Sequence, residues 1–486
     1  MYSQQYMVFQ SVHRIAPSRP DYNPTIFDQC SNMNTKSLFH GDSCAFVEQQ
    51  FIRGQRVWKH KSFQQASVKS QNITGESYAR NHGAKKYSKG AYRKWFQSKV
   101  HSPEAYPDKF ILLSYNILGD DNALFHSDLY CDIPPQLLDW SSRKRLICQE
   151  LDTWKPDIMC FQEVDHFDEL IEDFGEKGYS GIFKGRTGDA KDGCAIFWKK
   201  DRFSILQEES IEFNKYNLRD NVAQLCVFEL KNNLMADHAD KRSRQVEANS
   251  LQVHNHWKRK RIVIGNIHVL YNPKRGDIKL GQVRLLLQEA FALSQKWEKA
   301  PVVIAGDFNS TPQSALYQFL ASSKLDLQAH DRKQVSGQVE NVPGSDFRRL
   351  ATSKQNRYKW DGDELKTATG RSNCTRLQHP LKLFSAYASV RGSSRIRDDS
   401  GEPLATSYHS KFLGTVDYIW HSKGLIPLSV LDTLPLDILQ QTPGLPTDKW
   451  GSDHLALACE FALAKDEPVD NSNRGLQLEN RFVKSR

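Results

Sequence analysis

Hydrophobic and polar positions divide this chain into two parts. Up to about residue 106 the sequence is rich in Ser, Gln, Asn, Lys and Tyr, and it shows neither the alternation of a strand nor the period of a helix. From Phe110 onward, apolar runs of strand length alternate with a few helical segments. We therefore expect a disordered basic arm over residues 1–106, a folded domain over 107–464 and a flexible tail over 465–486.

The folded domain is predicted to contain more strands than helices. Strands are expected over residues 109–118, 156–164, 194–200, 203–213, 222–230, 261–270, 301–309, 415–422 and 454–463. Helices are expected over 141–154, where serines open the helix, over 277–297 and over 314–325. Polar stretches near residues 235–260 and 331–375 lack a period and are expected to be inserted loops. This pattern indicates an α/β fold of two mixed β-sheets packed face to face, with helices outside.

Composition excludes several classes of protein. The chain has 486 residues, of which 39% are hydrophobic, so it is not disordered throughout. No apolar run approaches the roughly 18 residues of a membrane helix. The N-terminus lacks the apolar core of a secretory signal, although its low acidic content is compatible with an organelle transit peptide. The nine cysteines form no CxxC pair, and Cys160 and Cys459 lie in apolar runs, which argues for reduced thiols and against a structural zinc site. We expect a cytoplasmic or nuclear protein, or one found in both compartments.

The net charge of +9 is concentrated in the arm. Residues 51–100 contain 12 Lys and Arg and one acidic residue, whereas residues 101–486 together carry −1. The basic run is either a solvated segment or an electrostatic tether for nucleic acid. Aromatic side chains interleave with the basic ones and could stack on unpaired bases: Trp58, Phe63, Tyr78, Tyr87, Tyr92, Trp95 and Phe96.

Polar side chains stand at the ends of otherwise apolar strands. They are Asn116, Glu163, Asn266, His268, Asp307, Asn309, Asp417, Asp453 and His454. Each one taken singly has a structural explanation, such as a turn former after a strand or a hydrogen-bonded core histidine. Together they are better explained by convergence on a cation and a phosphate, because isolated buried charges cost several kcal/mol. Mg²⁺ prefers oxygen ligands, and phosphodiester hydrolysis needs a positioned water and donors aimed at nonbridging oxygens.

The order of these motifs resembles a known superfamily. The set YNIL, FQEV, DGCAIF, NIHV, GDFNS, VDYIW and SDHLA is similar to the exonuclease–endonuclease–phosphatase superfamily, and within it to the carbon catabolite repressor (number four) deadenylases, most of all their plant homologues. The resemblance covers about residues 109–463. It implies a four-layer α/β sandwich and 3′-to-5′ removal of poly(A) from mRNA with release of 5′-AMP. It also implies one or two Mg²⁺ ions, for which Mn²⁺ could substitute.

The same resemblance implies roles at the metal and the water. Glu163 would bind Mg²⁺, and Asn116 and Asp453 would lie close to the metal and the phosphate. Asp307 would orient or deprotonate the attacking water. These four side chains come from four separate apolar segments, so the implied roles require the fold to bring the segments together.

Further roles are implied at the phosphate and the base. His268 and Asn309 would contact the scissile phosphate, with Asn266 supporting them. His454 would stabilise the developing charge, and Asp417 would orient it, since a carboxylate beside a histidine favours the imidazolium. For the adenine, the matching residues are an aromatic that stacks on one side and a proline that closes the other, Phe412 and Pro273. Phe412 could instead be simple loop packing.

Two departures from the family pattern narrow these expectations. Leu118 stands where the apurinic-site repair branch has an acidic residue, which argues against DNA repair. The chain has no leucine-rich repeat, which the yeast and animal deadenylases use to dock into the deadenylation complex, so subunits of that complex are candidate partners without an evident docking segment. Poly(A) RNA is the expected partner. A phosphatase for a small nucleotide and a non-catalytic RNA-binding scaffold stay open as alternatives, while the lack of an apolar membrane-contact segment disfavours a sphingomyelinase.

Overall fold

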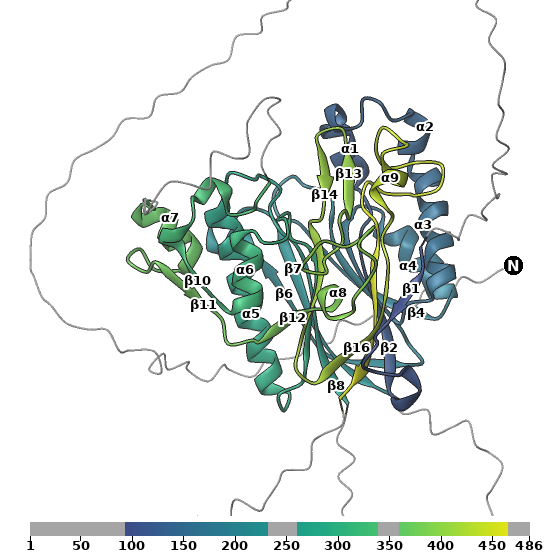
Figure 1. Ribbon diagram of the computed structural model, residues 1–486, viewed down its shortest axis with the longest axis horizontal. Helices are drawn as coiled ribbons and strands as arrows, with labels where there is room; N and C mark the ends of the chain where they lie inside the picture. The colour runs from purple at the N-terminus through teal and green to yellow at the C-terminus, as the bar shows by residue number, and fades with distance from the viewer. Residues whose placement is uncertain (1–92, 232–259, 339–358, 465–486) are drawn as a thin grey trace, which may run out of the picture. The chain divides into compact units, whose positions relative to one another are not determined.

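The computed structural model describes residues 93–231, 260–338 and 359–464. Figure 1 shows their two main sheets side by side, with helices on the outer faces. The first sheet is ordered β1 (Trp95–Gln97), β16 (Leu425–Leu431), β17 (Leu457–Leu463), β2 (Lys109–Asn116), β3 (Ile158–Val164), β5 (Gly193–Lys199) and β4 (Tyr179–Gly185). The second is ordered β12 (Leu383–Ser385), β15 (Asp417–Ser422), β9 (Val302–Asp307), β8 (Arg261–His268), β7 (Val222–Leu230) and β6 (Phe203–Glu212).

Short hairpins and helices complete the described fold. The hairpins are β10 (Lys324–Asp326) with β11 (Arg376–Gln378), and β13 (Ser407–His409) with β14 (Phe412–Gly414). The α-helices are α1 (Asp120–Phe125), α2 (Pro135–Leu138), α3 (Trp140–Trp154), α4 (Phe167–Glu176), α5 (Gly276–Lys296), α6 (Ala315–Ser322), α7 (Gly362–Thr369), α8 (Ala386–Ser389) and α9 (Leu436–Leu439). The 3-10 helices are η1 (Pro103–Ala105), η2 (Ser127–Leu129), η3 (Phe213–Tyr216), η4 (Leu327–Ala329) and η5 (Arg332–Gln334).

Three hydrophobic clusters hold the layers together. The central cluster lies between the sheets and includes Leu112 of β2 and Ile264 of β8. A second cluster packs α3 and α4 on the first sheet, with Ile147 and Phe174 fully buried. A third packs α5 and α6 on the second sheet, as Figure 1 shows on the opposite side. The four-layer α/β sandwich is confirmed, and its two sheets are mixed.

Each main sheet contains one parallel strand pair, β2–β3 in the first and β8–β9 in the second. The carboxyl ends of parallel neighbours meet at one edge of a sheet. β15 runs antiparallel to β9 and pairs Asp417 with Asp307, so the start of β15 lies at the same edge. β17 likewise runs antiparallel to β2. The polar residues that end or precede these six strands are therefore gathered at one end of the sandwich.

The predicted arm boundary at residue 106 is wrong. β1 pairs Trp95–Gln97 with β16, and Arg93 is buried, forming an ion pair with Glu150 at 3.1 Å and donating to the carbonyl of Asp432. Trp95 packs edge-on against Trp154 at 6.3 Å between ring centroids. A three-residue strand is too short to show a period, which is why the sequence pattern missed it.

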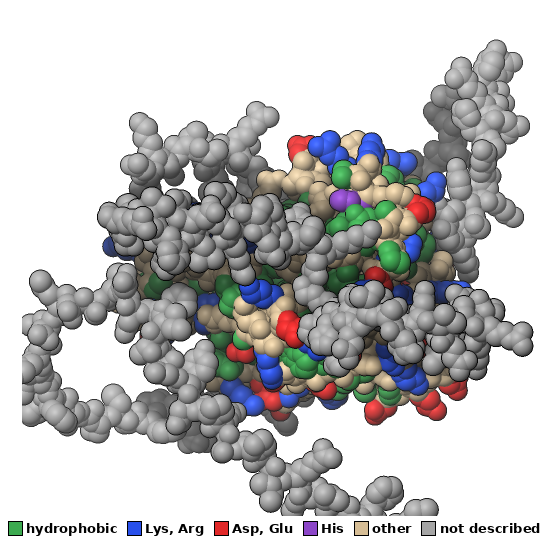
Figure 2. Space-filling model, turned by 90° about the horizontal axis from the view of Figure 1, so that it is seen from below, with side chains coloured by type: hydrophobic (Ala, Val, Ile, Leu, Met, Phe, Trp, Pro, Cys, Tyr) green, Lys and Arg blue, Asp and Glu red, His purple; other side chains and the backbone are tan. Residues whose placement is uncertain are grey.

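Other expectations for the arm and the tail lie outside the described residues. Phe96 packs against the central cluster, so neither it nor Trp95 is available as a base-stacking side chain of a free arm. The five remaining arm aromatics, the tail at 465–486 and the predicted insert at 235–260, except residue 260, are not described. On the face of the molecule that Figure 2 shows, basic side chains of the described residues lie among acidic ones.

The second predicted insert, residues 331–375, is not a plain loop. It contains η5 and α7, and a capping box begins α7. The Glu364 amide donates to Asp361 Oδ1 at 2.7 Å, and the Glu364 carboxylate accepts from the Asp361 amide at 3.1 Å. Leu365 and Ala368 of α7 are buried against the third cluster. Residues 339–358 of this stretch lie outside the described part. The helix has only two buried apolar positions, which is too few to produce a visible period.

Several elements differ from the predicted pattern for local reasons. The cap of α3 is Asp139, which accepts from the Ser142 amide at 3.1 Å, rather than a serine. β4 contains Gly181 and Gly185, and β16 contains Pro427 next to a register shift. Glycine and proline are poor strand residues, so tertiary pairing decides both strands. Among the described helices, none combines the length and apolarity needed to cross a membrane.

Candidate active site

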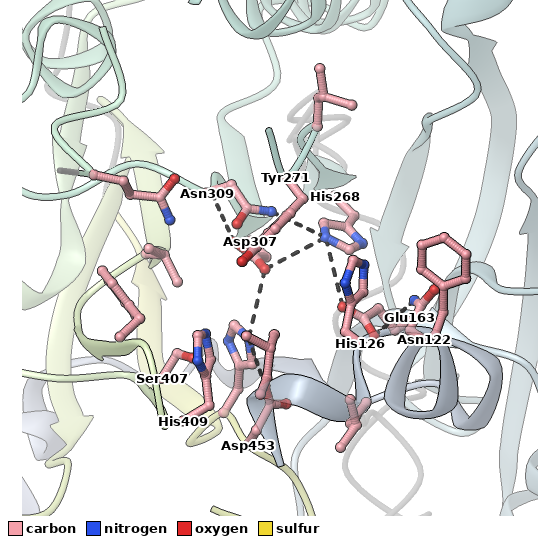
Figure 3. A pocket seen from close by; sticks show the side chains of 18 of the residues that line it. Asn122, His126, Glu163, His268, Tyr271, Asp307, Asn309, Ser407, His409 and Asp453 are labelled. Carbon is pink, nitrogen blue, oxygen red and sulfur yellow. Dashed lines mark hydrogen bonds and ion pairs between the residues drawn. The ribbon is translucent and has the colours of Figure 1, made fainter. Parts of the chain in front are cut away.

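The polar ends of the central strands line one cavity. Figure 3 shows it with Glu163, His268, Asp307, Asn309 and Asp453 pointing inward. His454 and Phe412 also line it. Asn116 and Asp417 are almost fully buried directly behind these side chains. Eight of the nine polar residues predicted from the sequence are therefore in or immediately behind one cavity.

A β-bulge aims Glu163 at the cavity. The pairing of β3 with β5 shifts register between Phe161 and Val164, and Glu163 has a positive φ of 56°. A non-glycine residue in this region carries strain that the surrounding structure must support. The support is a set of donors to its carboxylate: Asn116 Nδ2 at 2.9 Å, Asn122 Nδ2 at 2.9 Å and the Gly119 amide at 3.1 Å.

Asp307 lies at the centre of the cavity floor. Its Oδ2 is 3.2 Å from Asn116 Nδ2, 3.6 Å from His268 Nε2 and 3.9 Å from His454 Nε2. Its Oδ1 accepts from the Asn309 amide at 2.7 Å. The preceding residue must be glycine, because Gly306 has φ 147° and a Cβ there would lie 1.9 Å from the Ile267 carbonyl oxygen.

Two histidines face Asp307 from opposite sheets. His454 Nδ1 is 2.9 Å from Asp417 Oδ2, and that oxygen also accepts from the Thr406 hydroxyl at 2.6 Å. His268 Nε2 is 3.3 Å from Asn309 Nδ2 and 3.8 Å from Glu163 Oε1. Asp417 is thus placed to orient His454, whereas His268 lies between two carboxylates and an amide.

The charge state of each group follows from burial and its neighbours. Burial, with the negative charge of Asp417, raises the pKa of Asp307 to about 7. Burial opposes ionisation of Glu163, but nearby His268 and the amide donors outweigh it and lower its pKa. Burial lowers the pKa of His268 to about 4. Burial also disfavours a charged His454, but Asp417 and the neighbouring carboxylates raise its pKa well above the usual range.

Two predicted site residues do not reach the cavity. Asn266 is fully buried between the sheets, where it donates to the carbonyls of Phe161 and Ala195 at 2.9 and 3.0 Å and accepts from Gln162. It therefore links the two sheets and does not contact the side chains of His268 or Asn309. Pro273 does not line the cavity either, and its carbonyl faces the Ser336 hydroxyl at 3.3 Å. The loop after β8 presents a tyrosine to the cavity instead.

The comparison with family models decides the classification. The model described as the endonuclease/exonuclease/phosphatase family matches residues 113–454, which contain every residue lining this cavity. The chain belongs to this family.

Members of the family with curated names are similar to this chain over most of its length. Carbon catabolite repressor protein 4 homolog 5 from Arabidopsis thaliana is 51% identical, covering 78% of this chain and 83% of that protein. Homolog 3 from the same plant is 48% identical, covering 77% and 80%. Among solved structures, ANGEL2, described as a 2′,3′-cyclic phosphatase in complex with adenosine-2′,3′-vanadate, has a TM-score of 0.59 and 31% identity, covering 76% of this chain and 98% of that one.

The structure adds cavity residues that the sequence pattern missed. Asn122, Arg186, Tyr130, His126, Tyr271 and His409 all line the cavity. They lie outside the apolar strands, in α1, loops and a small hairpin, so the strand-end criterion could not find them. Tyr130 donates to Asp453 Oδ2 at 2.9 Å. Arg186 is held by Asp192 at 3.1 Å and brings a fixed positive charge to the wall.

Lys279 is a further missed residue, directly behind the cavity. Its ammonium is fully buried in α5 and donates to the carbonyls of Leu270 and Asn309 at 2.7 Å and to that of Tyr271 at 3.3 Å. Burial lowers the pKa of Lys279 to about 7. The side chain ties the loop after β8 to the loop after β9.

The side chains present fit a hard divalent cation. Glu163, Asp307 and Asp453 offer carboxylate oxygens, the ligand type that Mg²⁺ prefers. Burial raises the pKa of Asp453, and a cation bound beside it would favour its ionised form. Possible ligand atoms cluster twice in the described residues: at Asp307, Asp417 and His454 of this site, and at a separate group of Asp120, Asp165 and His166. There, however, Asp120 is already engaged by Arg143 and His166.

Proposed function

We propose that this protein is a Mg²⁺-dependent 3′-to-5′ exoribonuclease that shortens mRNA poly(A) tails and releases 5′-AMP. One observation carries the proposal: the carboxylates and histidines described above line the same cavity as the aromatic ring of Phe412. Phosphodiester hydrolysis and nucleobase contact can therefore occur together. The similarity to proteins named as carbon catabolite repressor protein 4 homologs supports an RNA substrate.

Asp307 is the proposed base. Enzymes separate acid and base roles by pushing the pKa values of neighbouring groups apart, and here the pKa of Glu163 is lowered while that of Asp307 is about 7. A base with a pKa near the working pH is well matched to proton transfer. Water attacks phosphorus as its proton passes to Asp307. The bond from phosphorus to the 3′ oxygen of the preceding nucleotide breaks, and this oxygen takes a proton from solvent.

The proposed phosphate donors are His268, Asn309 and His454. His268 Nε2 faces the cavity, whereas its Nδ1 is buried without a hydrogen-bond partner among the described residues. Asn309 Nδ2 is 3.3 Å from His268 Nε2. His454 presents an imidazolium oriented by Asp417, and preorganised donors of this kind stabilise charge that develops in the transition state.

The proposed metal ligands are Glu163 and Asp453, with the amide of Asn116 behind them. When bound there, Mg²⁺ would neutralise charge on the phosphate and help to position the water. The amide donors to Glu163 fix its carboxylate before any ion arrives.

The experiment uses 5′-labelled oligo(A) with the full chain in Mg²⁺ or in EDTA. We expect products that shorten from the 3′ end, with 5′-AMP as the released nucleotide, and no reaction in EDTA. Asp307→Asn should abolish cleavage and excludes a contaminating nuclease. Intact oligo(A) in Mg²⁺ would overturn the proposal.

A second candidate, a 2′,3′-cyclic phosphatase acting on RNA ends, is favoured by the similarity to ANGEL2. The same side chains suit it, because water attack on a cyclic phosphate opens one ring bond and leaves a terminal monophosphate. Oligo(A) ending in a 2′,3′-cyclic phosphate separates the two activities. The cyclic phosphatase gives a strand of unchanged length that ends in a monophosphate, and a separate phosphomonoesterase then removes this terminal phosphate. The exoribonuclease gives shorter strands.

A further inference from the structure

The mouth of the cavity carries a group of rings that the chemistry above does not use. Phe125, His126 and Tyr271 all line the cavity, and we call them the aromatic wall. The rings of Phe125 and His126 are 5.1 Å apart, and those of His126 and Tyr271 are 5.5 Å apart. Two separate elements, the end of α1 and the loop after β8, build this continuous surface.

The aromatic wall is unusually exposed. Phe125 is 83% and Tyr271 is 44% exposed. In the described part of the chain, only six large hydrophobic side chains are exposed, and these two lie at the mouth of the same cavity. A contiguous exposed apolar surface beside a cavity is typical of a ligand-binding groove. Aromatic rings stack on nucleobases without strong dependence on sequence.

The position of the aromatic wall is fixed relative to the catalytic groups. Asn122 of α1 donates to Glu163, and the amide of His126 caps the same helix by donating to the Asn122 carbonyl at 2.9 Å. On the other side, Lys279 holds the carbonyls of Tyr271 and Asn309 together. Both halves are thus tied to residues that face the phosphate.

Phe412 belongs to a third element, the β13–β14 hairpin, which also contacts the segment after α1 through the Ser410 hydroxyl and the Asp128 carbonyl. The ring of Phe412 is 6.0 Å from that of His409, and this hairpin is bonded to the Asp453 carbonyl through the Tyr408 amide. In Figure 3, His409 and Asp453 lie on one side, while Tyr271, His268 and His126 lie on the other. A scissile phosphate at Asp307 would thus have two aromatic surfaces in the cavity, one for each of its nucleosides.

We infer that the aromatic wall binds the base of the penultimate nucleotide of single-stranded RNA, while Phe412 takes the terminal base. This inference rests on the proposed function, because it requires an RNA 3′ end in the cavity. The wall makes the enzyme favour strands with a base at the penultimate position over single nucleotides and abasic ends.

The test compares a short oligo(A) with the same strand lacking its penultimate base, using the full chain. Loss of one stacked base should lower kcat/KM of the parent about tenfold. On oligo(A), the double variant Phe125→Ala/Tyr271→Ala should have a kcat/KM about tenfold below that of the parent. On the abasic strand, the double variant and the parent should have the same kcat/KM. Phe384→Ala, which removes a phenylalanine that is 46% exposed near the opposite end of β15, is the matched control and should behave as the parent.

A binding measurement keeps the inference separate from catalysis. Asp307→Asn protein is mixed with oligo(A) carrying 2-aminopurine at the penultimate or the terminal position. Quenching at the penultimate position should require the aromatic wall, and quenching at the terminal position should not. The inference is overturned if the wall variant keeps quenching at the penultimate position, or if it loses quenching at both positions equally. It is also overturned if the double substitution lowers kcat/KM on the abasic strand as much as on oligo(A). Absence of cleavage by the parent would count against the proposed function alone.

Discussion

Glu163→Gln tests whether Glu163 anchors the metal through a readout other than activity. Glutamine keeps one oxygen, which can still accept from Asn122 and the Gly119 amide. Its amide nitrogen replaces the oxygen that faces Asn116. Asn116 keeps its other hydrogen bond, from Nδ2 to Asp307 Oδ2 at 3.2 Å. One hydrogen bond is lost, at a cost of about 1 kcal/mol of unfolding free energy. The variant should therefore fold.

The metal-dependent part of stability should disappear. An ion present at 100 times its dissociation constant adds about 2.7 kcal/mol to the unfolding free energy. For about 320 described residues and an unfolding entropy of about 2 cal/mol/K per residue, this raises Tm by about 4 °C. If the variant binds the ion about 100-fold more weakly, only about 0.4 kcal/mol remains.

The assay is thermal unfolding of parent and variant across a Mg²⁺ titration. Glu402→Gln is the matched control, since Glu402 is also a buried carboxylate, accepts from the Tyr317 hydroxyl at 2.8 Å and does not line the cavity. It should keep the full Mg²⁺-dependent increase. An increase of parental size in Glu163→Gln would refute the assignment of the anchor.

Three further predictions concern pH, base contact and the basic arm. Burial raises the pKa of Glu402 to about 7 from an ordinary value of 4.5. The folded state therefore binds the Glu402 proton more tightly than the unfolded state. The unfolding free energy should fall by up to about 3 kcal/mol as pH rises from 4.5 to 7. Chemical denaturation at both pH values should show a decrease in unfolding free energy that is smaller in Glu402→Gln than in the parent by this amount, since the buried Asp307 contributes with the same sign in both proteins. Phe412→Ala should weaken oligo(A) cleavage by about 1–3 kcal/mol in kcat/KM while the Mg²⁺-dependent rise in Tm persists; unchanged cleavage contradicts the stacking role. Removal of residues 1–90, which spares the buried Arg93, should weaken RNA binding at low salt and make its salt dependence shallower, with little change in turnover of saturating short oligo(A); equal slopes in a salt series would show that the arm does not contact RNA.

The elements and most site residues were predictable from local pattern. Strands such as β2, β8 and β9 are continuous apolar runs, and a polar residue at the end of such a run is recognisable in the sequence. Asp307 and Glu163 were found in this way, and the geometry brings both into one cavity. The reason is general. Parallel central strands end at the same edge of a sheet, so residues at their carboxyl ends lie close together regardless of the conformation of the loops.

The cavity residues outside the strands were not predictable in this way. His126 and Tyr271 lie 145 positions apart in the sequence and meet only because α1 and the loop after β8 are packed at the same end. Lys279 reads as one polar position in an amphipathic helix, and its buried contacts with three carbonyls depend on two loops. β1 and α7 were missed because each is too short for its pattern to be visible.

The sequence alone determined where the continuous apolar strands lie and which polar residues stand at their ends, because both are local properties of the chain. The tertiary structure decided which of those polar residues reach the cavity. Asn266 and His268 lie two positions apart on the same face of β8, yet Asn266 bonds across to the facing sheet while His268 reaches the open end. Depth along a strand relative to the neighbouring sheet makes this difference, and only the packing of the two sheets sets it.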